Sequence, residues 1–287
     1  MSERCAGSEA TVREPVVAGL FYPEEPLELR QLVSRFLNEA PRLAFDAPIR
    51  GIVSPHAGYM YSGMVAGHGF AQVQGREYSH VILIGPSHFE YFRGACVFDG
   101  QAYRTPLGTV AVDRELAGRI AAGGSRISLG QAGHHLTETG EGEHSLEVVL
   151  PFLQVALGEC LLVPIVMAHQ NWETCQELAE AIARVANSKS VLLVASSDLS
   201  HYHTDEQARS MDRKLIACFE KMEPEELLRG VVLHQMEACG AGPIATVVQA
   251  CKLLGCTHAR SVCYATSGDV PGGDRTRVVG YMAGVLW

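Results

Sequence analysis

Histidines follow four predicted strands of this chain, at the point where each strand runs into a loop. The strands and their histidines are 49–54 with His56, 80–85 with His88, 161–167 with His169, and 190–195 with His201. In an open α/β sheet the carboxyl ends of parallel strands gather at one edge, where ligands bind. Imidazole is the commonest metal ligand and the commonest general acid or base near neutral pH. The pattern therefore predicts a metal or catalytic site assembled from segments far apart in sequence.

Strand-like runs alternate with helical patterns, the order that gives parallel pairing through right-handed crossovers. Helices are predicted at 63–73, 113–122, 172–186, 205–220, 224–231 and 243–254, a hairpin within 95–112, and strands at 260–266 and 277–286. Apolar residues between Leu146 and Leu157 also repeat at helical spacing, and Pro151 should kink or divide that helix.

These elements predict an α/β fold with a mostly parallel central sheet and helices on both faces. Mixed or antiparallel pairing is expected at the edge formed by the C-terminal strands. We expect a single domain over residues 1–287, in which residues 1–14 form a loose N-terminal segment.

The composition excludes several classes of protein. The formal charge of −9 argues against binding to nucleic acid or to an anionic membrane surface. No apolar run approaches the roughly 20 residues that a spanning helix needs. The N-terminus lacks a basic region followed by an apolar one, so no signal peptide is expected. Nine cysteines without a C-x-x-C pair favour reduced thiols over a structural zinc site. We therefore expect a cytoplasmic protein.

The stretch from Gly123 to Gly142 contains six glycines and two histidines, His134 and His135. This composition indicates a mobile surface loop. Because the stretch ends just before Glu143-His144-Ser145, it could act as a lid over the site. A solvated loop without function is the alternative.

Several short motifs occur in a specific order along the chain. They are Val17-Ala18-Gly19-Leu20-Phe21-Tyr22-Pro23, Ser54-Pro55-His56-Ala57-Gly58-Tyr59-x-Tyr61-Ser62-Gly63, Gly85-Pro86-Ser87-His88, Glu143-His144-Ser145-Leu146-Glu147 with Leu150-Pro151-Phe152-Leu153, Ser196-Ser197-Asp198-Leu199-Ser200-His201-Tyr202, and Cys239-Gly240-x-Gly242-Pro243-Ile244. Together they closely resemble the Memo family, called AmmeMemoRadiSam system protein B in prokaryotes. The resemblance covers about residues 15–287.

That family is structurally similar to the type III extradiol dioxygenases, which are non-haem iron enzymes. The resemblance implies that His56 and His88 are metal ligands and that Cys239 stands where the dioxygenases have a glutamate. It also implies that His201 is an acid/base residue, with Asp198 one helical turn before it, and that His144 lines the cleft. The prokaryotic family name implies a pathway partner that is a radical-SAM protein.

The residues themselves leave other interpretations open. His56 and His88 could cap turns without binding a metal, and Asp198 could cap the helix that follows His201. Cys239 precedes a predicted helix whose first position would be Pro243, so it is either a thiolate favoured by the helix N-terminus or a buried inert thiol.

Two tyrosines of the second motif have similar alternatives. Tyr59 and Tyr61 could hydrogen-bond an oxygen ligand beside the metal, and so contact the substrate, or could only pack against neighbouring side chains.

The first functional hypothesis is a metal-dependent oxidoreductase acting on an unidentified small molecule. Two imidazoles with open positions suit Fe²⁺, whereas a thiolate ligand shifts the preference toward copper or zinc. A second hypothesis is a non-enzymatic binding or adaptor protein that reuses a dioxygenase-like cleft. A third is a hydrolase with Cys239 as nucleophile and His201 as base.

Overall fold

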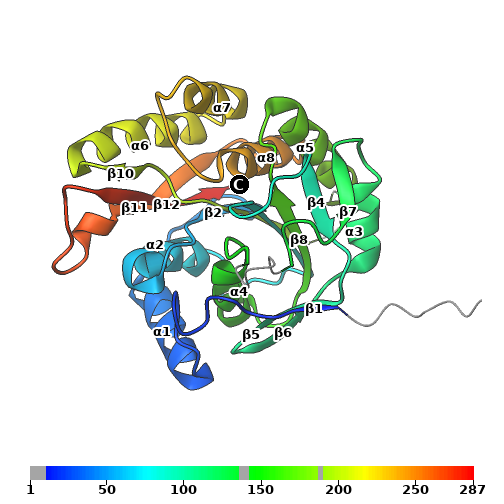
Figure 1. The fold of residues 1–287 in the computed structure, drawn as a ribbon, viewed down its shortest axis with the longest axis horizontal. Helices are drawn as coiled ribbons and strands as arrows, with labels where there is room; N and C mark the ends of the chain where they lie inside the picture. Colours follow the sequence, from blue (N-terminus) through cyan, green and yellow to red (C-terminus); the bar gives the residue numbers. More distant parts are fainter. Residues whose placement is uncertain (1–10, 136–141, 187–189) are drawn as a thin grey trace, which may run out of the picture.

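The computed structural model describes residues 11–135, 142–186 and 190–287. Its central strands are β2 (Gly51–Ser54), β9 (Val191–Ser196), β3 (His80–Pro86) and β8 (Leu161–Met167), in that spatial order. Each pairs in parallel with its neighbour (Figure 1). These are the four strands predicted from the sequence, and their parallel pairing brings their carboxyl ends to one edge of the sheet.

Antiparallel strands extend this sheet on both sides. On one side β12 (Val278–Leu286) pairs with β2, while β11 (Ala259–Thr266) and β10 (His201–His203) both pair with β12. On the other side β4 (Ala95–Phe98) runs antiparallel to β8 and parallel to β7 (Ile127–Gly130). The antiparallel edge predicted at the C-terminal end is confirmed. The antiparallel pairing of β4 was not anticipated.

A small separate sheet consists of β1 (Val12–Arg13), β5 (Ala102–Thr105) and β6 (Gly108–Ala111). Strands β5 and β6 form the hairpin predicted within 95–112. Residues 11–14 are not loose, because β1 pairs with β5 and the buried Arg13 forms an ion pair with Glu147. Residues 1–10 lie outside the described part of the chain.

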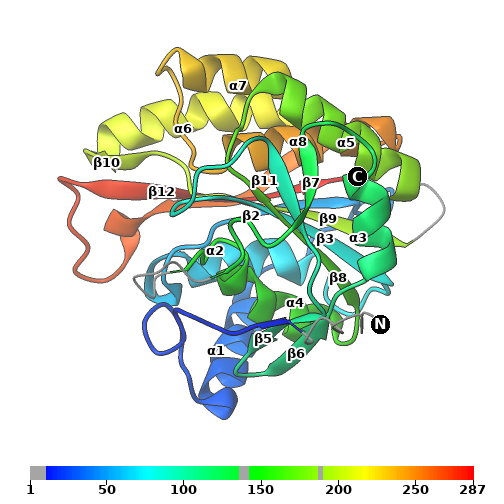
Figure 2. The ribbon, with the colours of Figure 1, turned by 45° about the vertical axis from the view of Figure 1, so that its right-hand side comes forward.

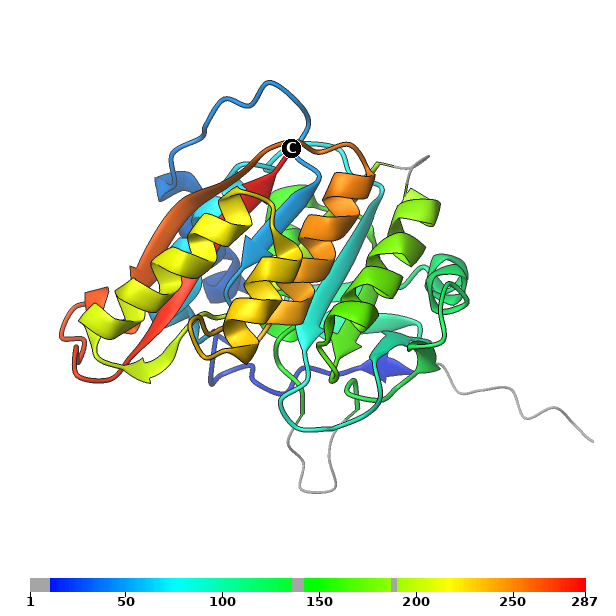
Figure 3. The same cartoon turned by 90° about the horizontal axis from the view of Figure 1, so that it is seen from above.

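Helices cover both faces of the large sheet, as predicted (Figure 2). One face carries α1 (Pro26–Glu39), α2 (Tyr59–Ala71) and α4 (Leu150–Leu157); the other carries α3 (Arg114–Ala121), α5 (Trp172–Ala186), α6 (Asp205–Glu220), α7 (Pro224–Val232) and α8 (Ala241–Leu253). Figure 3 shows α5, α6, α7 and α8 side by side over that second face.

Successive strand residues supply the two cores alternately, because side chains along a strand point to opposite faces. In β2, Ile52 packs against the first face and Val53 against the second. A sheet buried on both faces explains why the central strands are nearly continuous apolar runs.

Some helix boundaries differ from the predicted ones. Helix α2 begins four residues early, at Tyr59, whose N–H donates to the carbonyl of Phe21. Helix α8 is capped by Gly240, so Pro243 occupies its third position; Pro is accepted there because the first N–H groups of a helix have no intrahelical partner. The predicted helix is divided, as expected, into the 3₁₀ turn Glu147–Val149 and α4, whose second residue is Pro151. Helix α1 was not predicted.

The glycine-rich stretch is more ordered than expected. Within it β7 pairs with β4, and the ring of His134 is buried, with hydrogen bonds to the Tyr103 hydroxyl and the Cys96 carbonyl. The expectation of a mobile surface loop is wrong for this part. Residues 136–141, where a lid would have to lie, are outside the described residues. No helix in the described part of the chain is long and apolar enough to cross a membrane.

Candidate metal centre

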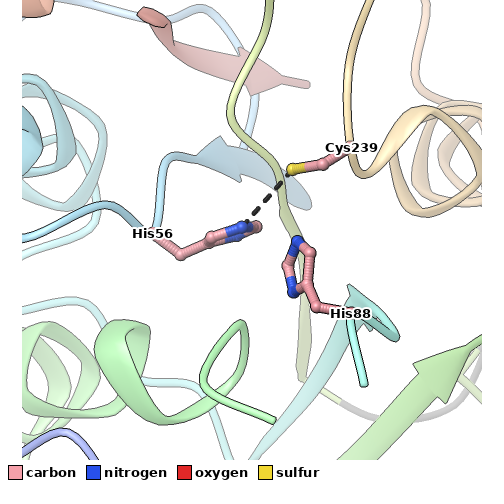
Figure 4. Close-up of side chains that lie close together, drawn as sticks. All are labelled: His56, His88 and Cys239. Atoms are coloured by element: carbon pink, nitrogen blue, oxygen red, sulfur yellow. Dashed lines mark hydrogen bonds between the residues drawn. The ribbon is translucent and has the colours of Figure 1, made fainter. Parts of the chain in front are cut away.

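Two imidazoles and one thiol converge at the carboxyl edge of the central strands. His56 follows β2, His88 follows β3, and Cys239 immediately precedes the cap of α8. Their candidate donor atoms all lie within 4.8 Å of one another. Figure 4 shows the three side chains facing a common point, with Cys239 Sγ 3.4 Å from His56 Nε2. The structure therefore brings together the three residues assigned as ligands by resemblance.

Hydrogen bonds fix the tautomer of His56. The Ser196 hydroxyl donates to the Ser145 carbonyl, so its oxygen is left to accept from His56 Nδ1–H at 2.7 Å. The lone pair of His56 is therefore on Nε2, the nitrogen that faces Cys239. Burial, followed by the neighbouring His88, lowers the pKa of His56 to about 3, so the ring stays neutral and able to bind a metal at pH 7.

His88 is oriented by Glu143, a residue that the sequence interpretation missed. The Glu143 carboxylate accepts from His88 Nδ1 at 2.9 Å and from the backbone N–H groups of His88, His144 and Ser145. Nε2 is thus the His88 nitrogen left for an ion, an arrangement typical of metal-bound histidines. The sequence did contain a signal for Glu143, because this residue directly precedes His144 in the fourth motif.

Glu143 itself is not a plausible ligand, although His88, Glu143 and His144 also lie close enough for a metal. Four donors already occupy the roughly four acceptor sites of its carboxylate. Burial acts to raise the pKa of Glu143, but hydrogen bonds and charge from His88 outweigh it and lower that pKa to about 2. Conversely, burial acts to lower the pKa of His88, and the Glu143 carboxylate raises it overall.

The spacing and chemistry of the donors fit a transition-metal ion. Bond lengths of about 2.0 Å to imidazole nitrogen and about 2.3 Å to sulfur place two such donors about 3.1–3.6 Å apart when they share an ion. The 3.4 Å between His56 Nε2 and Cys239 Sγ falls in that range. Imidazole suits iron, copper and zinc, whereas thiolate favours the softer ions.

Cys239 is not the stabilised thiolate that a helix N-terminus would favour. Its sulfur turns toward the exit of β9, where it accepts the Asp198 N–H at 3.3 Å. Burial of the sulfur, and then the charge of the Asp198 carboxylate, raise the thiol pKa well above its usual value. In the metal-free protein Cys239 is therefore a protonated thiol, because desolvation outweighs the effect of the helix.

Asp198 is hydrogen-bonded to the His56 backbone, and its interaction with His201 is one of charge. Its carboxylate accepts the backbone N–H of His56 at 2.9 Å. The segment from Asp198 to Ser200 belongs to no helix and His201 begins β10, so the two residues are not one helical turn apart. Among the residues that the structure describes, no hydrogen bond joins them. Within the described ranges, the carboxylate nearest to the His201 ring is that of Glu237, 3.8 Å from Nδ1.

His144 lies against the ligand pair. Its ring stacks on His88, with centroids 5.0 Å apart, and meets His56 edge-on at 5.8 Å. Burial, followed by the neighbouring His56, lowers the pKa of His144 to about 4. His144 is therefore a neutral imidazole at the edge of the site.

A cavity of about 1180 Å³ opens onto these residues. Its polar lining includes the residues His56, His88, His144, Asp198 and His201; the apolar lining includes Leu20, Phe21, Leu32, Phe36, Met60, Met64, Val65, Val270, Val279 and Tyr281. A mostly apolar cavity with a few converging polar groups is typical of a small-molecule site.

The two tyrosines assigned to substrate binding differ in availability. The Tyr59 hydroxyl is buried and donates to the Val148 carbonyl at 2.8 Å, so its proton is already used. Tyr61 lines the cavity and is 42% exposed. His169, which also ends a strand, is not among the cavity-lining residues; Gln170, the next residue, contacts the Cys239 segment.

Comparison with known proteins gives the family. The sequence matches the family described as "Memo-like protein" over residues 13–285. The chain belongs to the Memo-like family. MEMO1 family proteins from Nitrosopumilus maritimus and Methanocaldococcus jannaschii are each 35% identical to it, covering 95% and 96% of this chain and 98% and 99% of their own. That from Methanopyrus kandleri is 36% identical, covering 94% of this chain and 97% of its own.

A solved structure supports the fold of this Memo-like protein. It is the crystal structure of an uncharacterized protein from Escherichia coli K12, with a TM-score of 0.54 and 14% sequence identity. The match covers 83% of this chain and 99% of the other. At this identity the similarity shows the α/β architecture alone.

Proposed function

We propose that this Memo-like protein is a metal-dependent oxidoreductase that acts on a small molecule in the cavity beside His56, His88 and Cys239. The observation that supports it is the meeting of two tautomer-fixed imidazoles with a thiol, where both imidazoles also line an apolar cavity. A redox metal needs open coordination positions next to its substrate, and three protein donors leave such positions.

Fe²⁺ is the proposed ion, with copper and zinc as alternatives. His56, His88 and Cys239 would hold it, and its chemistry there would be electron transfer to or from oxygen or substrate. A thiolate in the position of a carboxylate makes the site softer than the usual triad of two histidines and one carboxylate. Copper is therefore a stronger competitor here than at a triad with a carboxylate.

The other residues of the site have roles that need no ion. His144 is neutral and can accept a proton from a hydroxyl of the substrate. His201 lines the cavity and is the second candidate for proton transfer, with Glu237 as its nearest carboxylate. Apolar lining such as Phe21 and Val65 excludes water, and the partly exposed Tyr61 can hydrogen-bond the substrate.

The test is purification without oxygen, metal analysis, and then oxygen uptake with a panel of catechols and other small reductants. We expect about one iron per chain and metal-dependent uptake with at least one compound. The matched control is His56→Ala, which should bind no iron and show no uptake. Full uptake by this variant would rule the proposal out, and stoichiometric zinc in the anaerobic protein would rule out iron as the ion.

A binding or adaptor function is the second candidate, favoured by the exposed apolar residues at the cavity rim. Leu20, Met60 and Tyr202 are 80%, 74% and 64% exposed, although all three line the cavity. Apolar side chains gathered around a cleft are typical of interaction surfaces. The partner proposed from the family name is a radical-SAM protein. Binding that survives His56→Ala and is lost in Met60→Asp would favour this function over turnover.

A further inference from the structure

We propose that Gln170 is a positioning residue that holds Cys239 against His56. Gln170 follows β8, the fourth of the central parallel strands, whereas His56 and His88 follow β2 and β3. The sequence pattern predicted His169 at the site after this strand. In the structure it is the next residue, Gln170, that contacts the site. This role deepens the proposed function. The effect of Gln170 on metal binding rests on that function, whereas its effect on the position of Cys239 does not.

The amide of Gln170 bridges two backbone groups on either side of the helix cap. Its Nε2 donates to the Cys239 carbonyl at 2.9 Å, and its Oε1 accepts the Gly242 N–H at 2.7 Å. The two backbone partners fix which end of the amide is which, because a carbonyl can only accept and an N–H can only donate. Gln170 therefore spans the turn that connects Cys239 to α8.

The two glycines of the Cys239-Gly240-x-Gly242 motif are explained by this packing. A Cβ on Gly242 would lie 2.7 Å from Gln170 Cβ, so only glycine lets the amide reach the backbone. A Cβ on Gly240 would lie 2.3 Å from the Ser196 carbonyl oxygen. The Gly240 N–H donates to Ser197 Oγ at 2.9 Å. The cysteine turn is thus held between the exits of β8 and β9.

Holding the turn sets the position of the sulfur. Cys239 Sγ lies 3.4 Å from His56 Nε2 and accepts the Asp198 N–H, and both contacts depend on where the Cys239 backbone lies. Ser197 fixes the turn from the β9 side, and Gln170 is the side chain that fixes it from the β8 side. Without the amide, the turn keeps its ties to the β9 exit, from the Cys239 N–H to the Asp198 carbonyl and from the Gly240 N–H to Ser197, but loses its tie to the β8 exit.

The test replaces Gln170 by Met, which has nearly the same length and lacks both the donor and the acceptor. The matched control is Gln154→Met. Gln154, in α4, also makes two hydrogen bonds. Its partners, Thr105 and Gly108, lie in the hairpin of the small sheet, away from Cys239. Each substitution removes two hydrogen bonds, so comparable losses of thermal stability are expected. Only Gln170→Met should change the behaviour of Cys239.

The first readout uses Co²⁺ alone as the probe in protein freed of metal. A thiolate ligand gives a sulfur-to-cobalt charge-transfer absorption, which a purely structural role of Gln170 would not alter. We expect the band in the parent and in Gln154→Met, and its absence in Cys239→Ser. In Gln170→Met the band should weaken and the Co²⁺ dissociation constant should rise about 10-fold or more, as when residues that orient metal ligands are lost.

The second readout needs no metal. Iodoacetamide alkylation of the metal-free protein, followed at the Cys239 peptide by mass spectrometry, should be several-fold faster in Gln170→Met than in the parent and in Gln154→Met. An unchanged alkylation rate together with an unchanged cobalt band would overturn the role of Gln170. If the parent binds no Co²⁺, the proposed function fails, and the alkylation rate alone then decides the role of Gln170.

A second variant covers the case in which Gln170→Met does not fold. Gln170→Glu keeps the size and the acceptor for the Gly242 N–H but faces the Cys239 carbonyl with a carboxylate oxygen in place of a donor. Faster alkylation of Cys239 is expected here too, and a rate equal to that of the parent would count against the inference.

Discussion

The sulfur of Cys239 lies 3.4 Å from Nε2 of His56, although 183 positions separate the two residues in the chain. His56 follows the central strand β2, and Cys239 belongs to a turn that Ser197 ties to the exit of β9 and Gln170 ties to the exit of β8. The distance between them is therefore set by backbone packing rather than by flexible side chains.

Loss of either histidine of the proposed centre should remove the metal. His56→Ala and His88→Ala each delete one donor, so we expect metal affinity to fall by more than the 10- to 100-fold typical of residues that only orient ligands. His201→Ala should retain the metal, because its ring lies outside the donor set. Metal content after anaerobic purification measures this, with His68→Ala on α2 as control. Equal losses in His56→Ala and His201→Ala would contradict the assignment.

Metal binding should strengthen as the pH rises. Burial raises the Cys239 pKa, so the thiol is protonated at pH 6–8 and must lose its proton to bind. His56, with a pKa of about 3, releases none, whereas His88, whose pKa is raised by Glu143, releases a second proton at the acidic end of this range. We therefore expect affinity for Co²⁺ to increase about tenfold per pH unit wherever one proton is released. Titrations between pH 6 and 8 measure the slope, which should be shallower in Cys239→Ser. A dissociation constant independent of pH would exclude a thiolate ligand.

Glu143→Gln should weaken metal binding by about 10- to 100-fold, because the amide cannot accept from all four donors of Glu143. It should also lower the stability of the metal-free protein in a pH-dependent way. A folded pKa of about 2, below the ordinary 4.5, stabilises the fold above pH 4.5, and this stabilisation is lost as the pH falls toward 2.

The contribution of Glu143 is up to about 3 kcal/mol above pH 4.5, from the difference in its pKa. Denaturant unfolding of parent and variant between pH 3 and 7 measures it, and the gap in the free energy of unfolding should narrow as the pH falls. The exposed Glu39→Gln serves as control. A gap that stays constant over this range would show that the Glu143 charge does not stabilise the fold.

Gly240→Ala should destabilise the protein and displace Cys239. The added Cβ would meet the Ser196 carbonyl oxygen at 2.3 Å, and overpacking of this kind typically costs about 1–3 kcal/mol. Gly118→Ala is the matched control, because it lies within α3 with no atom within 4 Å of the added Cβ. There the same change should stabilise by roughly 0.5–1 kcal/mol. Thermal or denaturant unfolding distinguishes the two, and a neutral Gly240→Ala would contradict the close packing of this turn.

The fold was largely predictable because its signals are local. Helices α5 and α6 have the predicted boundaries, and the four central strands were recognisable as apolar runs. The meeting of His56 and His88 followed from the parallel pairing of their strands. Helix α1 buries Leu29, Val33, Phe36 and Leu37 at helical spacing, a periodic signal that was present in the sequence but was overlooked.

The parts that could not be predicted depend on contacts between distant segments. The role of Glu143 requires donors from two loops, and that of Gln170 requires the turn before α8. The short strand β10 was not predicted; its central residue Tyr202 has a φ of +63°, which no simple pattern indicates. The two alternatives for Cys239 could not be separated from the sequence, because proximity to a helix N-terminus does not reveal how strongly the sulfur is desolvated.

The pairing of β12 with β2 has a consequence for how the protein acquires its ion. Strand β2, which leads to His56, has β9 on one side and on the other β12, the last strand described. A chain still growing on the ribosome presents both histidines long before Cys239 has been translated, and the edge of β2 stays uncovered until β12 emerges. Under the proposed function, metal loading is therefore a step that follows synthesis. The folded site must then compete with other cellular ligands for the ion.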